Sequence, residues 1–223
     1  HLAKQMAVFG IGADKVNNMM SALFYLENAT AANALEISSF NMQLGAAAKQ
    51  LKLSQAAASA WGATLVSAGM DASDAGTRVA SAQMIFYQHL ASDKNNSLRA
   101  AVEAIQLSAD GGKASLEGLA EILGTSSDQI TDYGQAIEDA LRVNAGQTFL
   151  VINRSLGQID DSVKQNTLSM AMYGAVGSKA MLTLAANSKL VEERQKAATE
   201  AFEQGAAIQE AYNVIASSNS EVL

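Results

Sequence analysis

Three short corners constrain the fold of this chain more than any other feature of its sequence. Each corner places a residue that can end a helix, then one spacer, then Ser or Asp; they are Lys52-Leu53-Ser54, Gly69-Met70-Asp71 and Gly124-Thr125-Ser126. Glycine ends a helix at little steric cost because it readily adopts the left-handed conformation. Ser54, Asp71 and Ser126 can accept hydrogen bonds from the free N–H groups of the next helix. The pattern predicts helices that turn at defined places.

The segments between the corners are rich in strong helix formers, and the chain contains no proline. Hydrophobic residues make up 49% of the chain but aromatic residues only 5%, so we expect a core of closely packed small side chains. These features predict an all-α fold, a multi-helix array of Ala-rich helices with short capped turns. The array is expected to end in a long helix, Lys189–Ser217, weakened at Gly205.

Apolar residues recur at helical spacing along most of the chain. The expected helices cover Ala3–Phe9, a segment from Asp14, Leu35–Leu51, Gln55–Gly69, Ala72–Ala91, Leu98–Leu107, a segment ending at Gly124, one beginning at Ser126, Asp161–Tyr173 and Ser178–Ala186. Ser126 and Gln129 form a capping box at the start of a helix that carries Tyr133. Thr148–Leu156 could be a strand in isolation, but its helical neighbours favour a buried helix. Gly174 and Gly177 are expected to break the chain.

The polar segment Ser108–Lys113 has the composition of a linker. It predicts two helical blocks, residues 1–107 and residues 114–223, joined by the linker 108–113.

Four residues are candidates for close helix packing. Ala58 and Gly62 form a small-xxx-small pair that lets another helix approach, and Trp61 and Leu65 extend the apolar surface. Trp61 is the only tryptophan, and a core position is a more common role for such a residue than stacking on a ligand.

No residue pattern predicts catalysis, a metal site or a cofactor. Cysteine is absent, and His89 is accompanied only by the terminal His1. The segment Gly111-Gly112-Lys113 is not a phosphate-binding loop, because Leu107 stands where a glycine is required. Neighbouring acids such as Glu138 and Asp139 point in different directions on a helix, unlike a general acid and base pair. We therefore expect a protein that is not an enzyme.

The chain carries a formal net charge of -7, which argues against nucleic-acid binding by phosphate neutralisation. Between Glu117 and Asp139 the sequence contains six acids and no base. A solvated helix face is the common reason for such a run, and a surface that docks a basic partner is the alternative.

An uncharged window, Leu53–Met70, is nearly long enough to span a bilayer. Its many small and hydroxyl-bearing residues make it only weakly apolar, so a buried helix is favoured. A membrane-active module, using this window and the Met-rich segment Met170–Leu184, remains the alternative function.

The stretch LGAAAKQLKLSQAAASAWGATLVSAGMDASDAGTRVASA resembles the helical region of phage tail tape measure proteins. The matching motifs are Leu51–Ser54, Gly62–Leu65, Gly69–Asp71 and Ala75–Thr77. LEGLAEILGTSSDQITDY and MYGAVGSKAMLTLAAN, at Leu116–Tyr133 and Met172–Asn187, resemble two later elements of the same family in the same order. The resemblance covers about Leu35–Ala206. Lys52 stands where the family commonly has glycine, and Tyr173 replaces its usual phenylalanine.

This resemblance implies a structural role in a phage or prophage tail. Tape measure proteins occupy the tail lumen, set the tail length during assembly in the host cytoplasm, and leave the tube when DNA is ejected. The implied partners are tail tube and baseplate or initiator proteins, tail assembly chaperones and further copies of the chain. No cofactor or sequence-specific nucleic acid is implied, and contact with a membrane is expected only during ejection. Because the sequence starts at His1, we interpret it as a piece of a longer polypeptide.

Overall fold

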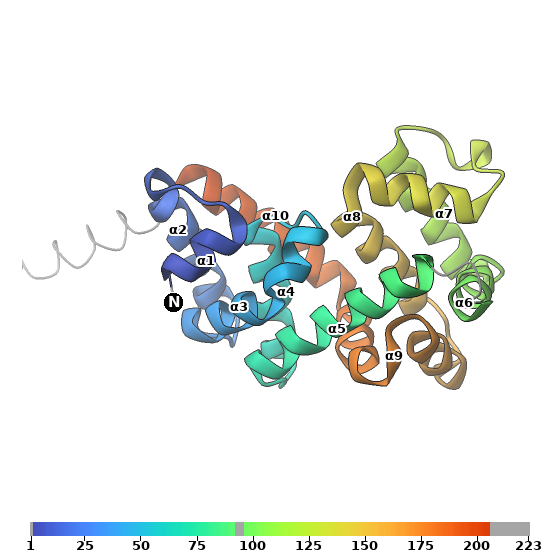
Figure 1. Cartoon of the computed structure of the whole chain (residues 1–223), viewed down its shortest axis with the longest axis horizontal. Coiled ribbons are helices and arrows are strands. Elements are labelled where there is room, and N and C mark those ends of the chain that lie inside the picture. Colours follow the sequence, from blue (N-terminus) through green and yellow to red (C-terminus); the bar gives the residue numbers. More distant parts are fainter. Residues whose placement is uncertain (1, 92–95, 206–223) are drawn as a thin grey trace, which may run out of the picture. The chain divides into compact units, whose positions relative to one another are not determined.

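The computed structural model describes residues 2–91 and 96–205, which are entirely helical apart from short connections (Figure 1). These residues form ten α-helices and two 3-10 turns, and none of them lies in a strand. The elements are α1 (Leu2–Phe9), η1 (Ala13–Lys15), α2 (Val16–Ala29), α3 (Ala34–Gln50), α4 (Gln55–Ser67), α5 (Ala72–Ala91), α6 (Asn96–Gln106), α7 (Ala109–Leu123), η2 (Ser127–Gln129), α8 (Tyr133–Gly157), α9 (Ser162–Ala186) and α10 (Ser188–Gln204). The all-α prediction is confirmed.

The chain divides into two compact units whose boundaries differ from the predicted blocks. Of the described residues, unit 1 contains 2–43, 54–76 and 189–205, and unit 2 contains 44–53, 77–91 and 96–188. The expected linker 108–113 is not a linker, because Ser108 is the N-cap residue of α7 and the segment from Ala109 is helical. Gly111 and Gly112 lie in the first turn, where added side chains would collide with backbone carbonyl oxygens of Ser155 and Gln106.

Unit 1 has an alanine-rich core in which α4 packs against α2. α10 joins this unit from the far end of the described chain, and Figure 1 shows it in red beside the blue α2. The Asn18 side chain of α2 donates a 2.6 Å hydrogen bond to the Phe202 carbonyl of α10. The core side chains are Ala22, Leu23, Leu26, Ala32, Ile37, Ala56, Ala60, Ala63 and Ala198. Small side chains on α4 and α10 therefore allow helices remote in sequence to share one core.

The helix α8 forms the centre of unit 2. It packs against α7, which precedes it in the chain, and against α9, which follows it, and α6 contacts all three helices. Thr148, Phe149, Val151, Ile152 and Leu156 are buried residues of α8. The segment Thr148–Leu156 is thus a buried helix, as predicted, and its branched residues serve the core.

Three of the helices contain a sharp interior break. The backbone leaves helical geometry at Gly45 in α3, at Asn144 in α8 and at Gly174 in α9. Asn144 recaps the second half of α8, because its Oδ1 accepts a 3.1 Å hydrogen bond from the Gln147 N–H. Gly177, which was also expected to break the chain, lies inside the helix. Its role is a close contact: a Cβ there would lie 2.5 Å from the Ala82 Cβ of α5.

The predicted terminal helix Lys189–Ser217 is described only in part. α10 ends at Gln204, and Gly205 adopts a left-handed φ of 62°. Residues 206–217 of the prediction lie outside the described residues.

Candidate functional site

The four predicted packing residues lie in the interior of unit 1. Ala58, Trp61 and Leu65 have no accessible surface, and Gly62 is buried with them on α4. A Cβ at Gly62 would lie 2.6 Å from ring atom Cδ1 of Phe40, so the glycine permits α3 to approach α4 through this ring. Every residue of α4 from Gln55 to Leu65 is buried. These side chains are therefore core contacts within the chain and offer no exposed face to a partner.

A cluster of polar side chains is buried beside this core. Asn41 Nδ2 of α3 donates a 2.8 Å hydrogen bond to Ser59 Oγ of α4, and Gln55 Nε2 donates to the same oxygen at 2.9 Å. Gln5 Oε1 of α1 accepts from Asn41 Nδ2 at 3.5 Å. All four side chains are at most 3% exposed, while Asn41 Oδ1 and Gln55 Oε1 meet no donor within the described chain.

This polar cluster is not among the sites predicted from the sequence, although the spacing of Asn41 contains a signal for it. Asn41 follows Ile37 by four residues and precedes Leu44 by three, which places the amide on the buried stripe of α3. A polar residue on such a stripe requires a hydrogen-bond partner in the core.

The first two predicted corners share one hydrogen-bond pattern. The spacer N–H bonds to the carbonyl five residues earlier, from Leu53 to Ala48 at 3.0 Å and from Met70 to Leu65 at 3.1 Å. This arrangement, the Schellman motif, satisfies carbonyl groups at the end of the helix. The cap residues then begin the next helix: Ser54 Oγ accepts from Ala57 N–H at 3.1 Å, and Asp71 Oδ1 accepts from Asp74 N–H at 2.9 Å.

The residues that end these helices adopt the left-handed conformation, with φ of 85° at Gly69 and 52° at Lys52. Lys52 is the only described residue other than glycine with a positive φ. Its side chain extends to the Arg142 carbonyl, and the Nζ–O distance is 3.3 Å. The structure thus requires at Lys52 the backbone conformation for which glycine is best suited.

The third corner begins as predicted but leads to a different element. Gly124 has a φ of 65° and ends α7, and Thr125 N–H bonds to the Ala120 carbonyl at 3.0 Å. Ser126, however, begins only the 3-10 turn η2, where Gln129 Oε1 accepts from the Ser126 N–H at 3.2 Å. The prediction that Ser126 caps the helix carrying Tyr133 is wrong, since that helix is α8 and its N-cap residue is Asp132.

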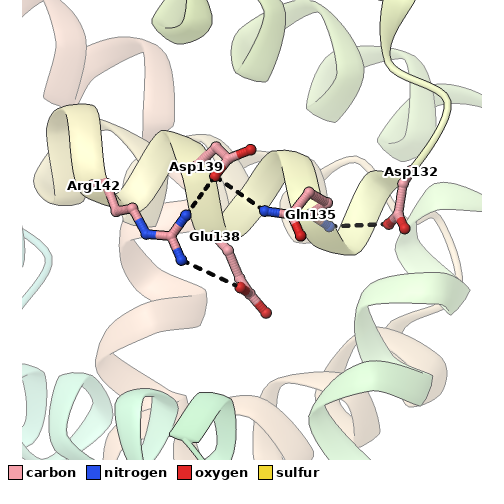
Figure 2. Close-up of polar contacts among 5 residues, drawn as sticks. All are labelled: Asp132, Gln135, Glu138, Asp139 and Arg142. Atoms are coloured by element: carbon pink, nitrogen blue, oxygen red, sulfur yellow. Dashed lines mark hydrogen bonds and ion pairs between the residues drawn. The ribbon is translucent and has the colours of Figure 1, made fainter.

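The acidic side chains of the segment Glu117–Asp139 are exposed or half-buried, and several of these carboxylates have local partners (Figure 2). Asp132 Oδ1 accepts from the Gln135 N–H at 3.0 Å, and Asp139 Oδ1 accepts from the Gln135 side chain at 3.0 Å. Arg142 bonds to Asp139 at 2.6 Å and lies 3.8 Å from Glu138. Exposed ion pairs of this kind contribute about 1 kcal/mol or less. The charge of Glu138 and Asp139 is balanced in part by Arg142, which the sequence places just beyond the acidic run.

At the start of the same segment, Lys113 pairs with Glu117 at 3.9 Å. The Ser126 side chain holds the pKa of Asp128 below its ordinary value by hydrogen bonding.

Three aromatic rings form the centre of unit 2. Phe149 of α8 lies with its ring centroid 5.6 Å from that of Phe86 of α5 and 5.5 Å from that of Tyr173 of α9. Phe86 and Tyr173 are themselves 6.1 Å apart. All three side chains are fully buried. Edge-to-face and offset contacts such as these add to the stabilisation from burial alone.

The two buried tyrosines of this unit differ in their hydrogen bonding. Tyr133 OH is bonded to Ser115 Oγ, whereas the Tyr173 hydroxyl has no partner among the described residues. Burial raises the pKa of Tyr133 to about 12, against the smaller opposing effect of Ser115. Burial also raises the pKa of Tyr173, with a further contribution from Tyr133. Both phenols are therefore neutral in the folded protein at any physiological pH.

Replacing Tyr173 with phenylalanine is expected to raise the free energy of unfolding by about 1 kcal/mol, because it removes a buried hydroxyl that has no partner. Tyr133→Phe is the matched control and should lower it by about 1 kcal/mol, since Ser115 loses its buried partner. Urea denaturation at pH 7 measures both changes. A loss of stability in Tyr173→Phe would contradict the assignment of the Tyr173 hydroxyl as a buried group without a hydrogen-bond partner.

The raised pKa values of Tyr133 and Tyr173 also predict how the stability of the fold depends on pH. A raised phenol pKa stabilises the fold below pH 10, the unfolded value, and this stabilisation is lost as the pH rises from 10 toward the folded value of about 12. Tyr173→Phe should therefore lose less stability over this interval than the unmodified chain.

No chemical centre is evident in the described part of the chain. It contains no group of three or more His, Cys, Asp or Glu side chains positioned to hold a metal ion. His89 is half-buried on α5, and its Nδ1 has no hydrogen-bond partner among the described residues. No helix within residues 2–91 and 96–205 is long and apolar enough to cross a membrane.

Comparisons with known proteins identify no relative. No family model matches the chain, and neither the curated proteins nor the solved structures contain a significant match to it.

Proposed function

We propose that this chain is a structural part of a phage or prophage tail tape measure protein. The observation that carries the proposal is the ordered resemblance of three separate segments to that family. Two of the corners within these segments, at residues 51–54 and 69–71, have the same helix-ending and capping geometry. A repeated corner suits a protein that is assembled from stacked helices and has a mechanical role.

The chain contributes compact helical blocks to the parent protein. Drawn out as one helix, 223 residues would reach roughly 330 Å, at ~1.5 Å per residue. The longest helices described, α8 and α9, have 25 residues each, and both are interrupted. The straight part of a molecular ruler would then lie elsewhere in the parent polypeptide.

In this role the partners are tail tube and baseplate or initiator proteins, with assembly chaperones in the host cytoplasm. Further copies of the chain are expected partners too, because a tail tube has rotational symmetry. The protein would reside in the tail lumen and act without a cofactor or a catalytic residue.

The proposal is tested by changing the length of the parent gene. Removing helical segments in frame from the straight part of the parent protein should shorten the tail by about 1.5 Å per residue removed, as measured by electron microscopy of purified particles. Reinsertion of an unrelated Ala-rich helix of equal length is the control and should restore the tail length. Tails of unchanged length after the deletion would refute the ruler function.

A further inference from the structure

The N-terminal helix α1 is attached to unit 1 in an unusual way. Gln5 is its only buried residue among Leu2–Phe9, whereas the Leu2 side chain is 37% exposed. Helices at the edge of a core normally bury an apolar stripe. The only fully buried side chain of α1 is instead the amide of Gln5, while Met6, Val8 and Phe9 are half-buried.

The hydrogen bond made by this amide is weak. Gln5 Oε1 lies 3.5 Å from Asn41 Nδ2, at the limit for such a bond, while the same nitrogen donates to Ser59 at 2.8 Å. Asn41 therefore retains a good hydrogen bond to α4 when Gln5 leaves.

The packing of α1 over Asn41 also carries an energetic cost. Asn41 Oδ1 is buried without a donor, and a buried carbonyl that meets no donor loses its hydration without compensation. Departure of α1 would give water access to Asn41 and recover part of this cost. The polar cluster thus lowers the free energy needed to detach α1.

The connection after α1 permits such a movement. Gly10 has a φ of 64°, and a Cβ there would meet no atom within 4 Å. Gly12 follows one residue later, just before η1. Two glycines around Ile11 allow the backbone to reorient at this point with little steric hindrance.

We propose that α1 is a strap that opens about Gly10–Gly12 while α3 and α4 stay folded. Gln5 is the latch of this strap, and opening exposes a polar surface formed by Asn41 and Ser59. This inference is independent of the proposed tail function, because it depends only on contacts within unit 1.

Amide hydrogen exchange of the full chain tests the strap. The Met6–Phe9 amides should show protection factors at least about 100-fold smaller than the buried α4 amides, with little dependence on urea. Equal protection and equal urea dependence in α1 and α4 would overturn the proposal, because α1 would then open only by global unfolding.

The latch is tested by Gln5→Ala, with Lys4→Ala as the exposed neighbour on the same helix. Gln5→Ala should lower α1 protection by about fivefold, the equivalent of one hydrogen bond, and leave α4 protection unchanged. Lys4→Ala should change α1 protection by less than about twofold. An equal change in α1 protection in both variants would show that the Gln5 side chain does not hold α1 in place.

Discussion

Replacing Trp61 with alanine is expected to lower the free energy of unfolding by about 3–5 kcal/mol, the range found when a large core aromatic is truncated. Trp61 is the largest fully buried side chain of the molecule as described, and it lies on a helix that is buried from Gln55 to Leu65. The cavity left behind could not collapse easily, because the backbone of α4 is held by neighbours all round. Urea denaturation followed by far-UV circular dichroism measures the loss.

Tyr25→Ala is the matched control for this prediction. Tyr25 is an aromatic residue of the same unit, but its side chain is 39% exposed, so its removal should cost about 1 kcal/mol or less. If Trp61→Ala had an equally small effect, Trp61 would not be the core anchor that its burial indicates. The comparison separates an internal packing role from the surface role that an isolated tryptophan could also have had.

Gly177→Ala is expected to lower the free energy of unfolding by about 1–3 kcal/mol through overpacking. The added Cβ would lie 2.7 Å from the Cα and 3.0 Å from the backbone nitrogen of Ala82. Because these are backbone atoms of α5, they cannot move aside as a flexible side chain could. The substitution is destabilising even though alanine is intrinsically favoured over glycine in a helix by about 1 kcal/mol.

Gly134→Ala provides a control of opposite sign. Gly134 lies in the first turn of α8, and its Cβ would meet only Asp132 Oδ1, at an ordinary 3.5 Å. Alanine there should raise the stability by up to about 1 kcal/mol. Thermal or urea unfolding of both variants measures the difference, and a stabilising Gly177→Ala would show that α5 and α9 do not approach as closely as described.

The predicted corner residues differ in how fully the local sequence determines their role. The sequence predicts corners at Ser54, Gly69 and Asp71 because the chemistry of these residues acts over a few positions, and the structure has corners there. Ser126 was assigned to the wrong helix because two capping residues, Ser126 and Asp132, lie within one short segment. Local preferences alone do not decide which of two good caps begins the longer helix.

The sequence by itself determined the all-helical character and the two corners at Lys52–Ser54 and Gly69–Asp71, since both depend on hydrogen bonds within five residues of the chain. Only the tertiary structure decided the rest. It distinguished Gly174, where the helix breaks, from Gly177, which contacts Ala82. It also brought Gln5, Asn41 and Ser59 into one buried cluster. Such contacts join segments that are remote in sequence, and their steric and polar requirements exist only once the helices are packed together.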